Sequence, residues 1–175
     1  MIINREITAQ SAVHLICGST GAGKTTYARA LCKDIGGLRF SIDDWMAVLY
    51  GDDRPAEADH AWYMARIDRI ERQIWTLVQP LAAQAVPAVL DLGFTTAEHR
   101  TRFHRLAQDA ALTTSLHVLE APAAERWRRV QQRNRERRET CALSVSRSDF
   151  DFVEALWEPP TEDEIARMNG RIIKT

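Results

Sequence analysis

The chain has 175 residues, a formal net charge of −1 and a pI of about 6.5. This balance excludes the global positive field of a dedicated nucleic-acid-binding domain. No apolar stretch approaches the roughly 20 residues that a membrane-spanning helix needs, and residues 1–12 lack the apolar region of a signal peptide. The cysteines, Cys17, Cys32 and Cys141, form no CxxC pair and no disulfide framework. We therefore expect a single cytoplasmic domain over residues 1–175.

The predicted elements alternate between strands and helices along the chain. In chain order they are a strand at 13–17, a helix at 25–34, a strand at 38–42, helices at 45–50 and 60–77, a strand at 87–92, a helix at 96–111, a strand at 116–119, helices at 122–139, 146–157 and 161–168, and an edge strand at 172–173. Strands separated by helices favour a parallel sheet with helices on both faces, and ligands of such sheets bind beyond the carboxyl ends of the strands. We expect an α/β fold of the P-loop NTPase type with a five-stranded parallel sheet.

The first predicted strand leads into a loop that fits the Walker A pattern at every fixed position. The loop consists of Gly18, Ser19, Thr20, Gly21, Ala22, Gly23, Lys24 and Thr25. Glycines let the backbone curl so that N–H groups point at phosphate oxygens, and the following helix adds the positive end of its dipole. We expect Lys24 to reach the β- and γ-phosphates and the Thr25 hydroxyl to bind Mg²⁺. Thr26 either contacts a phosphate or caps the helix.

The absence of an NKxD pattern, which reads guanine, favours ATP over GTP. The sequence therefore predicts a P-loop that binds ATP together with Mg²⁺.

Acidic residues follow two other predicted strands. Asp91 ends the apolar segment 85–91 and would face the Mg²⁺ shell, through water, if its strand neighbours the P-loop strand; alternatively it caps the next turn. Asp43 and Asp44 follow the second strand, where small kinases place the acid that accepts the proton of the attacking hydroxyl. We favour Asp43 because it follows the strand directly, with Asp44 capping a helix that begins at Trp45. In the alternative, both acids only cap that helix.

Arginines crowd the predicted helix at 122–139. Four of them fall on one stripe at 3.6 residues per turn, namely Arg126, Arg129, Arg133 and Arg137. A stripe of guanidinium groups opposite a P-loop would act as a lid that neutralises phosphate charge in the transition state and excludes water. The alternative is a solvated, salt-bridged helix face. An RNA-binding helix is less favoured, because aromatic interleaving is limited to Trp127.

Taken together, these motifs carry a family resemblance over about residues 13–160. The chain resembles the small P-loop kinases that include polynucleotide 5′-hydroxyl kinase, chloramphenicol phosphotransferase and the zeta toxins. It looks most like bacterial P-loop proteins of the kinase-like AAA-domain type that are described only as ATP-binding. The matching pieces are the P-loop and the segments 41–45, 90–94, 133–137 and 158–161. The resemblance implies that Asp43 is the catalytic base, that Arg133 and Arg137 contact ATP phosphates, and that Asp91 is an active-site acid.

The acceptor side departs from one member of that group. Polynucleotide kinase has an arginine three residues after its base that grips the acceptor's phosphate, and Met46 stands at that position here. A nucleic-acid acceptor is therefore disfavoured. The acidic and aromatic segment 52–64 could suit a cationic or sugar-like acceptor, although an ordinary loop and helix start is the simpler interpretation.

We expect a kinase that moves the γ-phosphate of ATP to a hydroxyl of a small-molecule acceptor. The alternatives are a kinase for a nucleotide sugar or a nucleic-acid end, and a non-catalytic ATP-dependent switch.

Overall fold

The computed structural model describes residues 12–137 and 145–175, without side-chain detail at Arg137. Five strands form one sheet in the order β2-β3-β1-β4-β5, and every neighbouring pair is parallel. The strands are β1 (Val13–Cys17), β2 (Leu38–Ser41), β3 (Ala88–Gly93), β4 (Thr114–Glu120) and β5 (Arg171–Lys174). The predicted five-stranded parallel sheet is therefore confirmed, with β5 at one edge.

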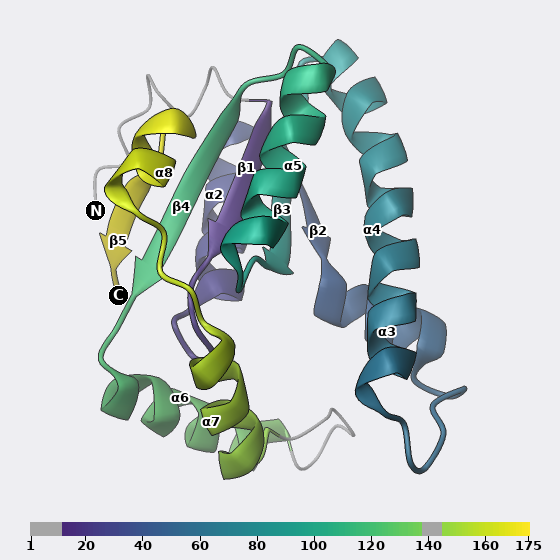
Figure 1. Ribbon diagram of the computed structural model, residues 1–175, viewed down its shortest axis with the longest axis vertical. Helices are drawn as coiled ribbons and strands as arrows, with labels where there is room; N and C mark the ends of the chain where they lie inside the picture. The colour runs from purple at the N-terminus through teal and green to yellow at the C-terminus, as the bar shows by residue number, and fades with distance from the viewer. Residues whose placement is uncertain (1–11, 138–144) are drawn as a thin grey trace.

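Helices cover both faces of the sheet and extend past one of its ends. Figure 1 shows α2 behind the sheet, α5 and α8 in front of it, and α6 with α7 beyond the carboxyl ends of β1 and β4. The helices are α2 (Lys24–Ile35), α3 (Ile42–Tyr50), α4 (His60–Ala83), α5 (Ala97–Asp109), α6 (Ala123–Arg137), α7 (Arg147–Leu156) and α8 (Glu162–Arg167). Among these helices, none has the length and apolar character needed to cross a bilayer.

The helix α4 extends further at its carboxyl end than predicted. The sequence pattern indicates an end of α4 at Leu77, but the helix continues through Pro80 to Ala83. Val78 is fully buried and Leu81 packs against the core. Because Pro80 removes only one backbone donor, this apolar packing outweighs the hydrogen bond that the proline costs the helix.

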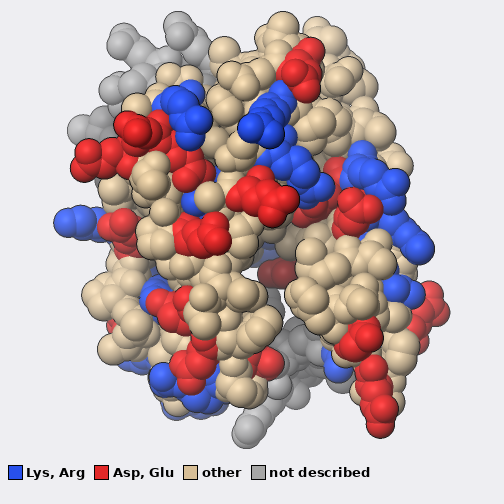
Figure 2. Space-filling view, viewed as in Figure 1, with Lys and Arg blue, Asp and Glu red and all other residues tan. Residues whose placement is uncertain are grey.

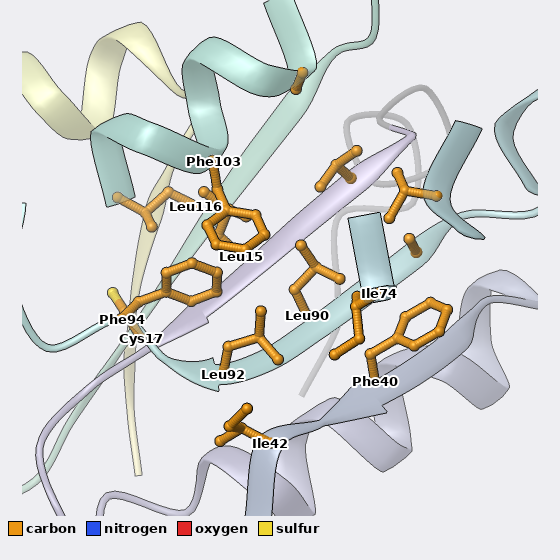
Figure 3. Close-up of a cluster of buried hydrophobic side chains, with 14 of the residues drawn as sticks. Leu15, Cys17, Phe40, Ile42, Ile74, Leu90, Leu92, Phe94, Phe103 and Leu116 are labelled. Atoms are coloured by element: carbon orange, nitrogen blue, oxygen red, sulfur yellow. The ribbon is translucent and has the colours of Figure 1, made fainter. Parts of the chain in front are cut away.

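The core consists of two clusters, one on each face of the sheet. Strand side chains alternate between the faces, so Leu15 lies in the cluster under α4 and α5, whereas Ile16 lies in the cluster under α2. Figure 3 shows the first cluster, where Leu90 and Leu92 of β3 point toward the same side as Phe103. The residue between them, Asp91, consequently points to the α2 face, and this places its carboxylate near the start of α2.

Candidate functional site

The P-loop joins β1 to α2 in a conformation that depends on glycine. Gly21 has φ 81°, and a Cβ added there would lie 2.5 Å from the carbonyl oxygen of Arg126. Gly23, with φ 86°, is the N-cap of α2, so no side chain caps the start of this helix. Both the backbone angle and the lack of space therefore require glycine at position 21. Because Gly23 is the N-cap and Thr26 is an exposed residue inside α2, the capping role considered for Thr26 is wrong.

Lys24 is the first residue of α2 and turns back over the loop. Its Nζ donates hydrogen bonds to the carbonyl oxygens of Gly18 at 2.7 Å and Ser19 at 3.2 Å. Burial lowers the pKa of Lys24, while the negative charges of Asp91 and Asp43 oppose that shift. The lysine thus lies close to both of the acids that the sequence singled out.

Asp91 contacts the residue that follows Lys24. The hydroxyl of Thr25 donates to Asp91 Oδ2 at 3.1 Å, as the pairing of β3 with β1 allows. The same Oδ2 accepts hydrogen bonds from Arg39 Nε at 3.0 Å and Nη2 at 2.8 Å. Asp91 is only 6% exposed. The structure therefore meets the geometric condition stated for Asp91, and it adds a partner, Arg39, that the sequence interpretation missed.

The two aspartates after β2 lie within the first turn of α3, not before it. Ser41 is the N-cap, and its hydroxyl accepts the backbone N–H of Asp44 at 3.3 Å. The helix begins at Ile42 rather than Trp45, because Ser41 can cap it and Ile42 can bury its side chain. The predicted capping by Asp44, and the alternative in which both acids cap, are therefore wrong.

The two acids have different surroundings. Asp44 Oδ2 accepts a hydrogen bond from Arg39 Nη1 at 2.8 Å. Burial raises the pKa of Asp43, the charge of Asp91 adds to the rise, and the charges of Lys24 and Arg133 oppose it. Asp43 is nevertheless an exposed residue, so the groups that raise its pKa surround its carboxylate on one side and leave it open to solvent on the other. Asp43 therefore lies beside the P-loop lysine, whereas Asp44 is engaged by Arg39.

Glu154 of α7 ties the P-loop to α6. It accepts a hydrogen bond from the Ser19 hydroxyl at 2.5 Å and two from Arg126, each at 2.7 Å. Arg126 also donates to the carbonyl oxygen of Thr20 at 3.2 Å and is only 6% exposed. The interpretation of Arg126 as part of a phosphate-facing stripe is therefore wrong, because a carboxylate and the loop backbone engage its guanidinium. We call the contacts among Ser19, Arg126 and Glu154 the α7 tie.

The other arginines of the predicted stripe have separate surroundings. Arg129 donates to Glu125 Oε1 at 2.9 Å and to the Thr175 hydroxyl at 3.1 Å. Arg133 lies close enough to Lys24 and Asp43 for its charge to act on the pKa of both. The side chain of Arg137 lies outside the described residues. Among the described arginines of the stripe, Arg133 is the one whose charge acts on both Lys24 and Asp43.

Two hollows adjoin the P-loop. A cavity of about 500 Å³ lies beside the α7 tie and is lined by Ser19, Arg126, Glu154, Trp157 and residues of β4 and β5. Figure 2 shows the other hollow, between the lobe of α6 with α7 and the lobe of α3, with acidic atoms inside it. We place the candidate site at the charged cluster of Lys24, Asp43 and Asp91, because none of these residues lines the 500 Å³ cavity.

Comparison with known proteins identifies the family to which the chain belongs. A family model described as an AAA domain matches residues 13–158. The chain belongs to this AAA-domain family. Among curated protein sequences, none matches. Family and fold together support a P-loop, kinase-like NTPase that binds nucleotide, so the predicted fold class and family resemblance are confirmed.

Several solved structures share the fold. Kti12 from Chaetomium thermophilum in complex with ADP-AlF3 is 19% identical, with a TM-score of 0.67 over 93% of this chain and 88% of that chain. A sugar kinase from Janibacter sp. HTCC2649 is 16% identical, with a TM-score of 0.62 over 94% of this chain and 85% of that one. A chain of the Pnkp1/Rnl/Hen1 RNA repair complex is 19% identical, with a TM-score of 0.64, and this protein spans 44% of its length. At these identities the likeness shows the fold.

Proposed function

We propose that the protein is an ATP-dependent phosphotransferase that moves the γ-phosphate to a hydroxyl of a small-molecule acceptor. The observation that carries the proposal is the convergence of Lys24 with the two acids Asp43 and Asp91 at the carboxyl ends of β1, β2 and β3. A P-loop alone binds phosphate, but phosphoryl transfer to a hydroxyl also requires a metal-side acid and a proton acceptor. In this proposal Asp91 is the metal-side acid and Asp43 is the proton acceptor.

The residues around the P-loop fit ATP and the Mg²⁺ that it carries. Backbone N–H groups of residues 18–26 and the positive end of α2 would hold the phosphates, with Lys24 at the β- and γ-phosphates. Thr25 and Asp91 present oxygen donors in mutual contact, which is the ligand type that Mg²⁺ prefers. When bound, Mg²⁺ would neutralise charge on the phosphate oxygens. Thr25 and Asp91 would hold the ion, directly or through its water ligands.

Asp43 acts as the base in this proposal. Its carboxylate accepts the proton of the acceptor hydroxyl, whose oxygen forms a bond to the γ-phosphorus while the bond to the bridging oxygen breaks and ADP leaves. The raised pKa of Asp43 makes its carboxylate a better proton acceptor than an ordinary aspartate. Lys24 and Arg133 offset the charge that develops on the phosphoryl oxygens, with Arg137 as a further candidate from the end of α6.

A non-catalytic ATP-dependent switch is the second candidate, and the α7 tie favours it. Because Glu154 holds both Ser19 and Arg126, a change in the P-loop on nucleotide binding would be transmitted to α6 and α7. A kinase for a nucleotide sugar or a nucleic-acid end is a third candidate. Met46, where polynucleotide kinase has its phosphate-gripping arginine, argues against the nucleic-acid version.

A metabolite screen tests the proposal. The protein is incubated with MgATP and fractionated small-molecule pools, and the products are analysed by mass spectrometry. We expect an acceptor whose mass rises by about 80 Da, the mass of one transferred phosphoryl group. The Asp43→Asn variant serves as the control and should yield no such product. Tight MgATP binding without any phosphorylated product across broad pools would contradict the kinase and favour the switch.

A further inference from the structure

Arg39 joins two parts of the candidate site that have separate tasks. Its Nε and Nη2 donate to Asp91 Oδ2, and its Nη1 donates to Asp44 Oδ2. Asp91 is the acid beside Thr25, and Asp44 lies next to Asp43 in the first turn of α3. One guanidinium therefore contacts both the metal-side acid and the helix that carries the proposed base.

The sheet register explains how one side chain reaches both acids. Ser41 of β2 is paired with Asp91 of β3, and Arg39 lies two residues earlier on the same face of β2. Such a diagonal position is within reach of a long side chain. Because α3 begins directly after β2, Asp44 lies in the first turn of the helix, where its carboxylate is within reach of Arg39 Nη1. The fold thus brings Arg39 and both acids together.

The contact with Asp91 is well shielded from water. The Arg39 side chain is 13% exposed and that of Asp91 is 5% exposed. Removing one partner of such a pair leaves an uncompensated buried charge, whereas an exposed pair contributes little. The oxygen that Arg39 contacts, Oδ2, also accepts the Thr25 hydrogen bond, so it faces the place where Thr25 and Asp91 would hold Mg²⁺. Arg39 and a metal ion therefore draw on the same negative charge.

The contact with Asp44 is exposed but directional. The Asp44 side chain is 57% exposed, so its ion pair with Arg39 adds little to stability. The contact of Arg39 with the Asp44 side chain does restrain the first turn of α3. The Ser41 hydroxyl restrains the same turn by accepting the backbone N–H of Asp44. Asp43 belongs to that turn, and small displacements of a catalytic group slow a reaction strongly.

We propose that Arg39 is a positioning residue with two separable effects: its contact with Asp91 weakens Mg²⁺ binding at the P-loop, and its contact with Asp44 orients the turn that carries Asp43. The second effect rests on the proposed kinase function, whereas the first requires only nucleotide and metal binding. The two effects have opposite signs in an Arg39 variant, which binds Mg²⁺ more tightly and turns over more slowly. A merely structural arginine would impair both.

The metal effect is tested without any acceptor. ATP binding is followed by a fluorescent analogue while MgCl₂ is titrated, and the thermal shift caused by MgCl₂ alone is recorded. In Arg39→Gln we expect the half-saturating Mg²⁺ concentration to fall about fivefold, which corresponds to about 1 kcal/mol, and the Mg²⁺-induced thermal shift to increase. Arg72→Gln, which removes an exposed arginine paired with Asp68 on α4, should change neither. An unchanged or raised half-saturating concentration in Arg39→Gln would overturn this effect.

The orientation effect is tested with Asp44→Ala, which removes the contact of Arg39 with residue 44 and keeps its contact with Asp91. We expect a half-saturating Mg²⁺ concentration within about twofold of the wild type, faster amide exchange at residues 42–45, and phosphoryl transfer slowed about tenfold. Arg39→Lys, which keeps the charge but not the fork, should show the same faster exchange. Unchanged exchange in both variants would contradict the orienting role. If no acceptor is ever phosphorylated, the proposed function fails while the Mg²⁺ titration still decides the first effect.

Discussion

Two of the charged clusters among the described residues, one under α5 and α8 and one beside the P-loop, differ in how their charges are matched. Under α5 and α8, Arg100 is fully buried and its guanidinium binds Glu164 through two hydrogen bonds of 2.5 and 3.1 Å. Beside the P-loop, Lys24 and Arg133 act electrostatically on the shared acid Asp43, which is an exposed residue. A buried ion pair such as Arg100 with Glu164 is compatible with a stable fold because each charge has its own partner. Charges that are shared and accessible to solvent, as at Asp43, can instead form new interactions when a triphosphate binds.

The largest effect that would sharpen this contrast is expected at Lys24. Lys24→Met removes the point charge directed at the β- and γ-phosphates and leaves no buried acid unpaired in a sealed core. We expect phosphoryl transfer or ATP hydrolysis to fall about 10²–10³-fold, with ATP affinity also reduced, while the melting temperature stays near that of the wild type. Steady-state kinetics, titration calorimetry and a thermal melt measure these three quantities. A Lys24→Met variant that retained wild-type ATP affinity and turnover would contradict a functional role for the charged cluster beside the P-loop.

Arg100→Met should have the reverse profile. It leaves the carboxylate of Glu164, which is 4% exposed, without its cation. Removing one partner of a buried ion pair costs about 3–5 kcal/mol of unfolding free energy, so we expect a large loss in chemical denaturation and unchanged ATP affinity in the folded fraction. The double variant Arg100→Met with Glu164→Met should recover much of the loss. A fully stable single variant would show that this pair is not a structural element.

Most of the fold can be predicted from the sequence, because strand burial and glycine positions are local signals. The P-loop strand and the glycine turn after it follow from residues 13–25 alone. The start of α3 is harder, because Ser41 and Asp44 are both good caps and only the packing of Ile42 decides between them.

The partners within the site are not local signals. Arg39 and Asp91 are 52 positions apart, and Ser19 and Glu154 are 135 apart. The sequence offered one usable hint for Arg39, a charged residue between Leu38 and Phe40 on the face that Ser41 shares. Glu154 offered none, because an acid in an amphipathic helix is ordinary. Contacts of this kind depend on strand order and helix placement.

A smaller effect is expected at the α7 tie. Glu154→Gln keeps the size of the side chain but weakens its hydrogen bonds to Arg126, whose guanidinium favours a charged acceptor. We expect ATP affinity to fall about threefold to tenfold, because the Ser19 side of the loop is less well held. Titration calorimetry measures this, with the exposed Glu136→Gln in α6 as the matched control. Equal affinities of the two variants would show that the tie does not act on the loop.

The smallest effect concerns pH and the unliganded protein. Burial raises the pKa of the Asp43 carboxyl above its ordinary value of 3.8. Between the ordinary and the raised pKa, the folded state binds a proton that the unfolded state does not, so the unfolding free energy falls as pH rises through that window. Asp43→Asn should lack this pH dependence, and at pH values above the raised pKa it should be slightly more stable than the wild type. Chemical denaturation at a series of pH values compares the unfolding free energies of the wild type and the variant. If the wild type became more stable relative to Asp43→Asn as the pH rose, the raised pKa of Asp43 would be contradicted.

The central claim, that the acids beside the P-loop carry out phosphoryl transfer, is tested most directly by Asp43→Asn. Its MgATP affinity and its single-turnover rate with an identified acceptor are measured on the same preparation. We expect the affinity to stay within about twofold of the wild type and the rate to fall about 10²–10⁴-fold, as for the loss of a general base. A variant that binds MgATP normally and transfers phosphate at the wild-type rate would contradict the account.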